Sequence, residues 1–382
     1  MITLAIAVRQ QQLPTIAGYG VGVSAAAIAG IVGGGGTTLV FNTGDLTTQR
    51  AVRYVRIALV TPFVLLVVSG VTVGYHALTD LAWPAVLAGG LTALMNNLSE
   101  VEQGYLRQHL RVPHIVLSDL SARAVGLAAV MLHWSVATAF LIVASIRWSN
   151  LAWFSRDDPS RKFFGKLDAR SATRKAFAKG PFSLTLLYIL QDRMPFMWAG
   201  MIPPSSLAGV FGATQSSQQT VASILMTGPQ TVLARRATLR RASHNSVDPE
   251  SERKSLLRFE MLVVLAAVCV SAAFITLRSP LCALLGLNLD ENVERTWILV
   301  FAALPVSITH RVMHLRLADQ SRYRPATWSM SVSLLGSLSI AIIAVTQQDL
   351  SMLASSPLFG EGAGLIWLLL LLRTPSGAAT TE

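Results

Sequence analysis

One stretch, residues 179–236, decides the fold, and it reads KGPFSLTLLYILQDRMPFMWAGMIPPSSLAGVFGATQSSQQTVASILMTGPQTVLARR. It contains two apolar runs, Pro181–Ile202 and Leu207–Leu233, which are joined by the short corner PPSS at residues 203–206. Each run reaches the length of about 20 residues that a helix needs to cross a bilayer. The stretch therefore predicts a hairpin of two membrane-spanning helices.

A polar triplet, Gln191-Asp192-Arg193, interrupts the first run near its middle. An ionisable side chain at that depth costs roughly 2.5–3.5 kcal/mol on insertion scales, so it indicates a pathway or a binding site. Adjacent residues point about 100° apart on a helix, and Arg193 has no carboxylate three or four residues away. We interpret Arg193 as a cation that faces a cavity, with Asp192 and Gln191 as coupling or orienting groups. The alternative is that they pair with another helix.

Composition extends the membrane assignment to the whole chain. Of its 382 residues, 13% are charged and 52% are hydrophobic, whereas soluble domains carry about 25% charged residues. Long apolar blocks outside the hairpin predict spans at Thr15–Phe41, Ile57–Tyr75, Trp83–Leu98, Val112–Leu132, Ser135–Phe154, Leu257–Leu277, Trp297–Leu315, Ala326–Val345 and Gly364–Leu372. No stretch has the pattern of a strand, so we predict an all-α polytopic membrane protein with about 11 full spans.

The basic residues are distributed unevenly between the two sides that these spans define. With the side alternating at each span, 24 of the 31 Lys and Arg residues fall on one side and only Arg9, Arg278 and Arg295 on the other. The positive-inside rule makes the first side, which includes the C-terminus, cytoplasmic. Topology thus accounts for the net charge of +11, and no nucleic-acid partner is expected. The two cysteines belong to no CxxC or Cys/His cluster, so neither a metal nor a cofactor is expected.

The spans group into two halves. We predict an N-terminal lobe at 1–154, a basic cytoplasmic loop at 155–180, a C-terminal six-helix lobe at 181–373 and a cytoplasmic tail at 374–382. Similar Gly-containing segments, residues 16–20 and 207–212, open the second helix of each half. Such a parallel pseudo-repeat of two six-helix lobes is typical of transporters. The apolar stub Ile2–Val8 cannot cross a bilayer, so the first helix is expected to be truncated in this chain.

These segments resemble a known family. Residues 13–20 (LPTIAGYG), and residues 189–193 (ILQDR) followed by 207–213 (LAGVFGA), are similar to segments of the bacterial polysaccharide flippases of the multidrug/oligosaccharidyl-lipid/polysaccharide (MOP) superfamily. The resemblance implies twelve spans in two lobes that open alternately to each side of the bacterial plasma membrane. It also implies export of an undecaprenyl-diphosphate-linked oligosaccharide, with a polysaccharide polymerase and glycosyltransferases as partners. No enzymatic activity is implied.

Further ionisable residues lie inside predicted spans. Asp119 and Arg123 are four residues apart, so they either neutralise each other on one helix face or line the cavity. Arg311 lies beside His310 and His314, which share a face without an accompanying carboxylate in that run. We therefore predict no metal site there. The candidate cations for binding the cargo are Arg193, Arg123 and Arg311, and the candidate coupling or orienting groups are Asp192, Asp119 and Gln191.

Three classes of function remain open at this stage. Four intramembrane arginines against Asp119 and Asp192 favour an anionic cargo, and hence a flippase, over a cation-coupled multidrug exporter. A membrane polysaccharide polymerase or sugar transferase needs ionisable groups on a sizeable loop, and the outward stretches 278–295 and 346–361 hold few. A scaffold without transport activity is the third class, which an incomplete first lobe would allow.

Overall fold

The computed structural model describes residues 12–35, 46–79, 81–109, 111–161, 170, 173–174, 177, 179–242, 249–320 and 322–373. Within these ranges the regular elements are helices, and no strand occurs. Eight helical segments in these ranges have the length and apolar composition needed to cross a membrane. The predicted fold class, an all-α polytopic membrane protein, is thereby confirmed.

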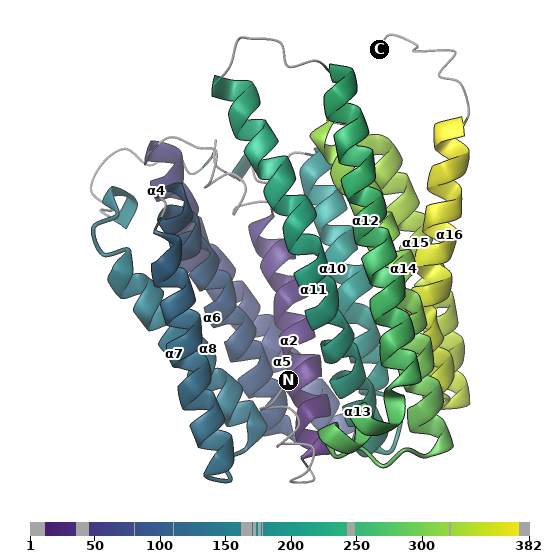
Figure 1. The fold of residues 1–382 in the computed structure, drawn as a ribbon. Coiled ribbons are helices and arrows are strands. Elements are labelled where there is room, and N and C mark those ends of the chain that lie inside the picture. Colours follow the sequence, from purple (N-terminus) through teal and green to yellow (C-terminus); the bar gives the residue numbers. More distant parts are fainter. Residues whose placement is uncertain are drawn as a thin grey trace. The chain divides into compact units, whose positions relative to one another are not determined.

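The chain forms two units, Met1–Ala213 with Ala283–Asn288, and Thr214–Cys282 with Leu289–Glu382. The elements of the first unit are α2 (Leu13–Gly34), α4 (Leu46–Val55), the π-helical η1 (Arg56–Val60), α5 (Thr61–Leu78), α6 (Trp83–Gln108), α7 (Val112–Met131), α8 (Val136–Phe154), η2 (Pro159–Arg161) and α10 (Lys179–Ala199) (Figure 1). Those of the second unit are α12 (Pro249–Thr276), α14 (Glu291–Asp319), α15 (Tyr323–Gln347) and α16 (Leu350–Arg373). Helices α11 (Ser205–Ala242) and α13 (Arg278–Leu285) contribute residues to both units.

These units do not have the bounds of the predicted lobes, because α10 and the start of α11 belong to the first unit. Helix α10 packs along α2. At Gly209 in α11 a Cβ atom would lie 2.2 Å from the carbonyl oxygen of Leu13 in α2, so only glycine fits there. The division into lobes at 1–154 and 181–373 stays a prediction. The tail 374–382 and most of the linker 155–180 beyond residue 161 lie outside the described residues.

Every predicted span coincides with a helix over most of its length, but two predicted connections are wrong. The sequence places residues 42–56 between the predicted spans Thr15–Phe41 and Ile57–Tyr75 and hence in a loop, whereas the described part is helical from Leu46, with α4 continuing through η1 into α5. Residues 346–361 were expected to connect two spans, and α16 already begins at Leu350. Both errors arise where polar residues of a helix face protein instead of lipid.

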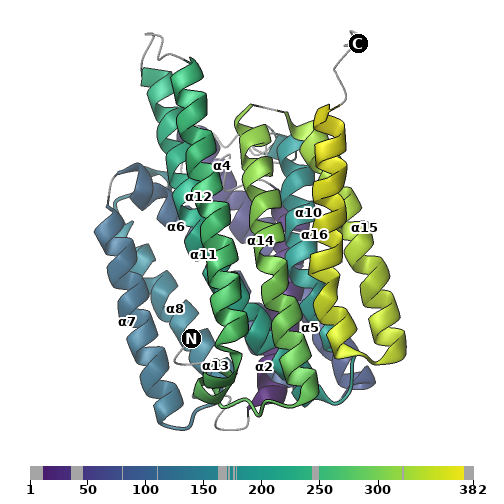
Figure 2. The same ribbon diagram turned by 45° about the vertical axis from the view of Figure 1, so that its right-hand side comes forward.

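The polar first half of α16 packs inside the second unit. Ser355, Ser356, Gly360 and Glu361 are buried there, and α15 and α16 lie side by side along their lengths (Figure 2). A Cβ atom on Gly360 would lie 2.0 Å from the Oγ atom of Ser337. Small residues thus let the two helix backbones approach closely, as is usual between membrane helices.

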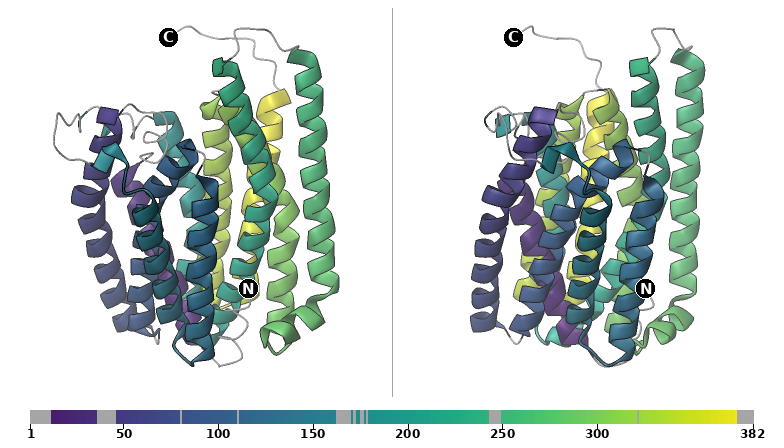
Figure 3. Two further views of the ribbon diagram at one scale, coloured as in Figure 1. Left: turned by 60° about the vertical axis from the view of Figure 1, so that its left-hand side comes forward. Right: turned by 90° about the vertical axis from the view of Figure 1, so that its left-hand side faces the viewer.

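Helix α2 is the centre of the first unit and packs against α5, α6 and α10. Figure 1 shows α2 and α5 running along each other, and Figure 3 shows the first unit from two further sides. The tightest approach is between α2 and α6. A Cβ atom would lie 1.8 Å from the Val86 carbonyl oxygen at Gly22, and 2.2 Å from the Tyr19 carbonyl oxygen at Gly89. Both helices therefore require glycine at their crossing.

We expect Gly22→Ala to destabilise the first unit by about 1–3 kcal/mol, because the added methyl group overlaps the α6 backbone and must force the helices apart. Gly74→Ala in α5 is the matched control, since a Cβ atom there meets nothing within 4 Å. The measurement is the fraction of purified protein that stays monodisperse after heating in detergent. An equal loss for both variants would contradict the close approach of α2 and α6.

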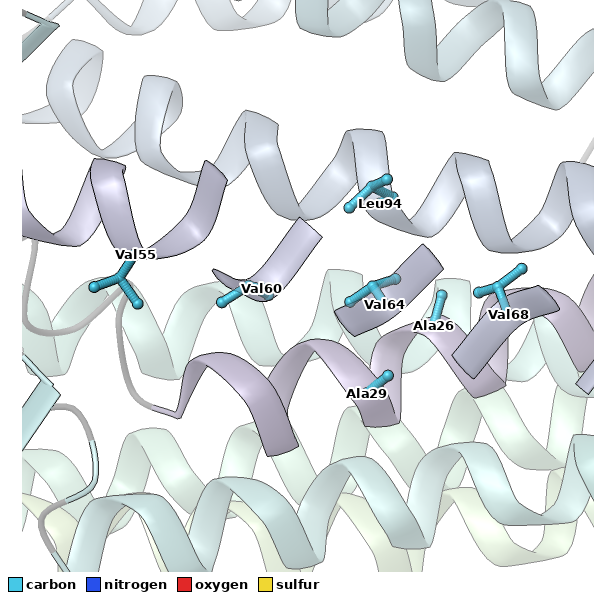
Figure 4. Close-up of a cluster of buried hydrophobic side chains, with 7 residues drawn as sticks. All are labelled: Ala26, Ala29, Val55, Val60, Val64, Val68 and Leu94. Atoms are coloured by element: carbon cyan, nitrogen blue, oxygen red, sulfur yellow. The ribbon is translucent and has the colours of Figure 1, made fainter. Parts of the chain in front are cut away.

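An apolar cluster fixes α5 and its approach segment against α2 and α6. Its buried members are Ala26, Ala29, Val55, Val60, Val64, Val68 and Leu94 (Figure 4). The valines of α4, η1 and α5 in this cluster lie between the alanines of α2 and Leu94 of α6 in this view. This packing holds the continuous helical segment 46–78 in place and sets the position of the charged residues at its start.

A buried ion-pair network ties α4 to α6 and to the segment after α8. Arg53 in α4 binds Glu102 of α6, with 2.6 Å between Nη1 and Oε1, and its Nη2 pairs with Asp158. Its Nε donates to the Ser160 hydroxyl at 2.7 Å. Arg161 completes the network with 2.9 Å between its Nη2 and the Glu102 Oε2 atom. The side chains of Arg53, Glu102 and Asp158 are each at most 7% exposed, so this network explains why residues 46–55 are ordered as a helix.

Candidate functional site

Arg193 is placed by the packing of α10 on α2. The ring of Phe196 in α10 lies against Gly20 of α2, and Gly200, just after α10, lies against Val21 of α2. The Tyr75 hydroxyl of α5 donates a hydrogen bond of 2.7 Å to the carbonyl oxygen of Met197. These contacts fix the second half of α10, and with it the position of Arg193 one turn earlier.

The guanidinium of Arg193 has unfilled hydrogen-bonding capacity. Its Nε atom is buried and has no hydrogen-bond partner in the described part of the chain, and none of the ion pairs among the described residues involves it. Arg193 interacts electrostatically with Tyr19 of α2, whose ring packs on Phe140 of α8 with 5.1 Å between centroids. A half-buried arginine of this kind can receive an anion, because its fork of N–H donors binds two oxygens at once.

The other two members of the polar triplet lie on the same turn of α10. Gln191 is buried and Asp192 is half-buried. All three residues belong to the first unit. Their assignment as cargo-binding and coupling groups stays a prediction.

Asp119 is bound mainly by an arginine from a different helix. Its Oδ1 lies 2.5 Å from the Nε of Arg147 in α8, whereas its Oδ2 lies 3.6 Å from the Nη2 of Arg123. Arg147 also donates to the Asn96 side chain of α6 at 3.4 Å. The side chain of Arg123 is 72% exposed. Sequence spacing pointed to Arg123 as the partner, and it could not reveal Arg147 or Asn96, because helix periodicity reports only neighbours on one helix.

Arg311 belongs to α14 and thus to the second unit. It is half-buried, and its charge acts on His314 one turn along the same helix. In the first unit the structure therefore brings together Gln191, Asp192 and Arg193 on α10, and separately Asp119 and Arg123 on α7.

A further buried cluster was missed from the sequence. His310 of α14 pairs through Nδ1 with Glu361 of α16, and both side chains are almost fully buried. The Nε2 atom of His310 lies 2.6 Å from the Ser329 Oγ atom of α15. The sequence showed His310 and His314 without a carboxylate in their run. The carboxylate comes from a helix whose polar first half was assigned to a connection. No group of three or more His, Cys, Asp or Glu side chains that could hold a metal occurs among the described residues.

Comparisons with known proteins place the fold. No known protein family and no curated protein matches the sequence. The structure is similar to an inward-facing multidrug resistance MATE family transporter of the MOP superfamily, with a TM-score of 0.66, 13% identity and coverage of 97% of this chain and 92% of the other. It is also similar to the lipid II flippase MurJ in an inward closed conformation, with a TM-score of 0.65, 11% identity and coverage of 98% and 88%. For the eukaryotic MATE transporter AtDTX14 the values are 0.55, 13%, 97% and 87%.

The chain is thus a multi-pass membrane protein with the fold of the MOP superfamily. The fold is the one that the sequence resemblance implied, while membership of the polysaccharide flippase family stays a prediction. The similar structures are described as transporters or as a flippase and not as enzymes.

Proposed function

We propose that this protein is a flippase that moves an undecaprenyl-diphosphate-linked oligosaccharide, or a related polysaccharide precursor, across the bacterial plasma membrane. The observation that carries the proposal is the half-buried Arg193, whose guanidinium has no ion-pair partner in the described part of a transporter fold. A cation inside a membrane protein is costly without an anion. A diphosphate offers oxygens at the spacing that the arginine fork binds.

The two lobes, 1–154 and 181–373, would open alternately to each side, with Arg193, Arg123 and Arg311 as cations for the cargo and with Asp192, Asp119 and Gln191 as coupling or orienting groups. The similarity to a lipid II flippase supports a lipid-linked cargo. A polysaccharide polymerase and glycosyltransferases would supply and use this cargo, and they are the partners we propose.

A cation-coupled multidrug exporter is the second candidate, since two of the similar structures are described as MATE transporters. A cationic drug beside Arg193 would be repelled by the guanidinium unless a carboxylate screened it. The ion pair of Asp119 with Arg147 occupies one of the two intramembrane aspartates that could do so. The charge balance therefore favours the anionic cargo. A polymerase or sugar transferase is the third candidate, and no feature of the described residues favours it.

The deciding experiment places the purified protein in liposomes with two cargoes. One is a fluorescent polyprenyl-diphosphate oligosaccharide, whose accessibility to an external lectin reports flipping. The other is a cationic dye, whose efflux reports drug export. We expect flipping above that of protein-free liposomes, and no dye efflux. Efflux of the dye without flipping would replace the proposal by the multidrug exporter, and neither activity under any ion gradient would favour a scaffold.

We also propose that the central loop and the C-terminus are cytoplasmic, because 24 of the 31 Lys and Arg residues lie on that side of the alternating spans. Reporter fusions at Ala169 and after Arg373 should give a cytoplasmic signal, and a fusion after Glu291 should give an external one. An external signal at Ala169 would overturn this topology.

A further inference from the structure

The hydroxyl of Thr92 in α6 departs from the pattern of other buried hydroxyls in the first unit. Such hydroxyls in helices commonly bond the carbonyl oxygen one turn earlier, as Ser24 of α2 and Thr72 of α5 do at 2.7 Å. Thr92 is 4% exposed, yet its Oγ1 atom has no hydrogen-bond partner among the described residues. A buried hydroxyl without a partner is costly, so this one points to a ligand.

A second unfilled atom lies near the first. It is the buried Nε of Arg193 in α10, which also has no hydrogen-bond partner within the described ranges. The hydroxyl of Tyr19 in α2 has both Thr92 and Arg193 as polar neighbours. The Tyr19 ring packs on Phe140 of α8 with 5.1 Å between centroids, and all four residues belong to the first unit. Two unfilled hydrogen-bonding atoms therefore adjoin one tyrosine hydroxyl whose ring is held in place.

Close helix packing independently brings these groups to the same part of α2. Gly89 of α6, where a Cβ atom would lie 2.2 Å from the Tyr19 carbonyl oxygen, is one turn before Thr92 and shares its face. Phe196 of α10 is one turn after Arg193 and shares its face, and its ring packs on α2 at the residue after Tyr19. Helices α6 and α10 thus each turn the face with the unfilled atom toward this part of α2.

The donors at this junction suit an anion with more oxygens than one arginine can bind. The charge that acts on the Tyr19 hydroxyl is that of Arg193, and a guanidinium fork binds two oxygens of one phosphate. The hydroxyls of Tyr19 and Thr92 can each donate one further hydrogen bond without adding charge. A diphosphate has a second phosphate group that needs such donors, whereas the fork alone can hold a monophosphate.

We propose that Tyr19 and Thr92 are specificity residues of the Arg193 site, and that their hydroxyls bind the second phosphate group of a diphosphate-linked cargo. This inference rests on the proposed function, in which Arg193 binds the diphosphate, and it adds the residues that select a diphosphate over a monophosphate. The packing of the Tyr19 ring on Phe140 lowers the cost of binding, because the hydroxyl is already positioned before the ligand arrives.

The test is the binding of two soluble probes, farnesyl diphosphate and farnesyl monophosphate, to the full-length protein in detergent, measured by titration calorimetry. We expect the wild-type protein to bind the diphosphate at least about tenfold more tightly, because a hydrogen bond to a charged group contributes about that factor. Tyr19→Phe and Thr92→Val each remove one hydroxyl and keep the shape of the side chain. Each should weaken binding of the diphosphate by about tenfold and change that of the monophosphate by less than about twofold.

The matched control is Thr72→Val in α5, which removes a buried hydroxyl whose hydrogen bond to the Val68 carbonyl oxygen stays within its own helix. Both affinities should stay at their wild-type values in this variant. The proposal is overturned if Tyr19→Phe and Thr92→Val keep the wild-type preference for the diphosphate, or if they weaken binding of both probes equally, as a structural role would. Equal affinity of the wild-type protein for the two probes, or binding of neither, would also overturn it and needs no variant.

The probe measurement and the liposome measurement can fail separately. Selective binding of the diphosphate probe without flipping in liposomes would overturn the proposed function and leave the two-phosphate site in place. Flipping without selectivity between the probes would overturn only the role of Tyr19 and Thr92.

Discussion

Replacing Arg193 by alanine should lower flipping of the diphosphate-linked cargo by about 10- to 100-fold, because charge-assisted hydrogen bonds contribute about 1.5–3 kcal/mol. The Nε atom of Arg193 is buried and has no hydrogen-bond partner in the described part of the chain. Among those residues Arg193 forms no ion pair, so the substitution does not deprive a carboxylate of its cation. Insertion and folding should therefore be retained. Arg193→Lys keeps the charge but loses the planar fork, and it should retain partial activity.

The control for this prediction is a variant that lacks a different arginine, Arg295. Arg295 forms an exposed ion pair with Glu291 four residues earlier in α14, so Arg295→Ala should leave both transport and protein level near wild type. Flipping and the amount of folded protein are measured together for all variants. Wild-type flipping by Arg193→Ala at a wild-type protein level would remove this residue from the mechanism. A parallel loss of both quantities would assign it a structural role.

The spans could be predicted from the sequence because lipid-facing helices need long apolar blocks, and this requirement is visible in one dimension. The prediction of helices from hydropathy fails where a helix packs against protein instead of lipid, because its residues can then be polar. The first half of α16 is polar because Ser356, Gly360 and Glu361 pack inside the second unit. Residues 46–55 are helical because Glu102 and Asp158 compensate Arg53 in the interior. In both places polar residues lie in the protein interior. Hydropathy does not show this, because the partners that surround them are far away in the sequence.

The candidate site was predictable to a smaller extent for a related reason. Arg193 could be singled out because the absence of a carboxylate one turn away can be read from its own helix. The pairs of Asp119 with Arg147 and of His310 with Glu361 each join two helices. Residues 310 and 361 are 51 positions apart, and no spacing rule connects them. Pairing across helices is set by packing. Glycines such as those at positions 22, 89, 209, 360 and 364 mark where helices approach closely, but they do not show which charged side chains meet.

The largest loss of stability is expected from Glu102→Ala. The substitution leaves Arg53, buried at 7% exposure of its side chain, without its bidentate partner, and it also removes the acceptor of Arg161. Breaking a buried pair by deleting one member typically costs about 3–5 kcal/mol, because the remaining charge stays desolvated. Glu291→Ala in α14 is the control. Glu291 is 75% exposed and pairs with Arg295, which is itself 61% exposed, so its loss should cost at most about 1 kcal/mol.

The pH dependence of the same network gives a second readout. Burial alone would raise the pKa of Glu102, but the hydrogen bonds and charge of Arg53, with hydrogen bonds from Ser155 and Arg161, outweigh it and hold the pKa below its usual range. At low pH the unfolded chain then binds a proton that the folded chain does not. The stabilisation is therefore complete above the ordinary glutamate pKa of about 4.3 and is lost as the pH falls through the lowered value. The thermal midpoint of the wild-type protein should fall on acidification more steeply than that of Glu102→Gln, and parallel curves for the two proteins would show that Glu102 does not carry this stability.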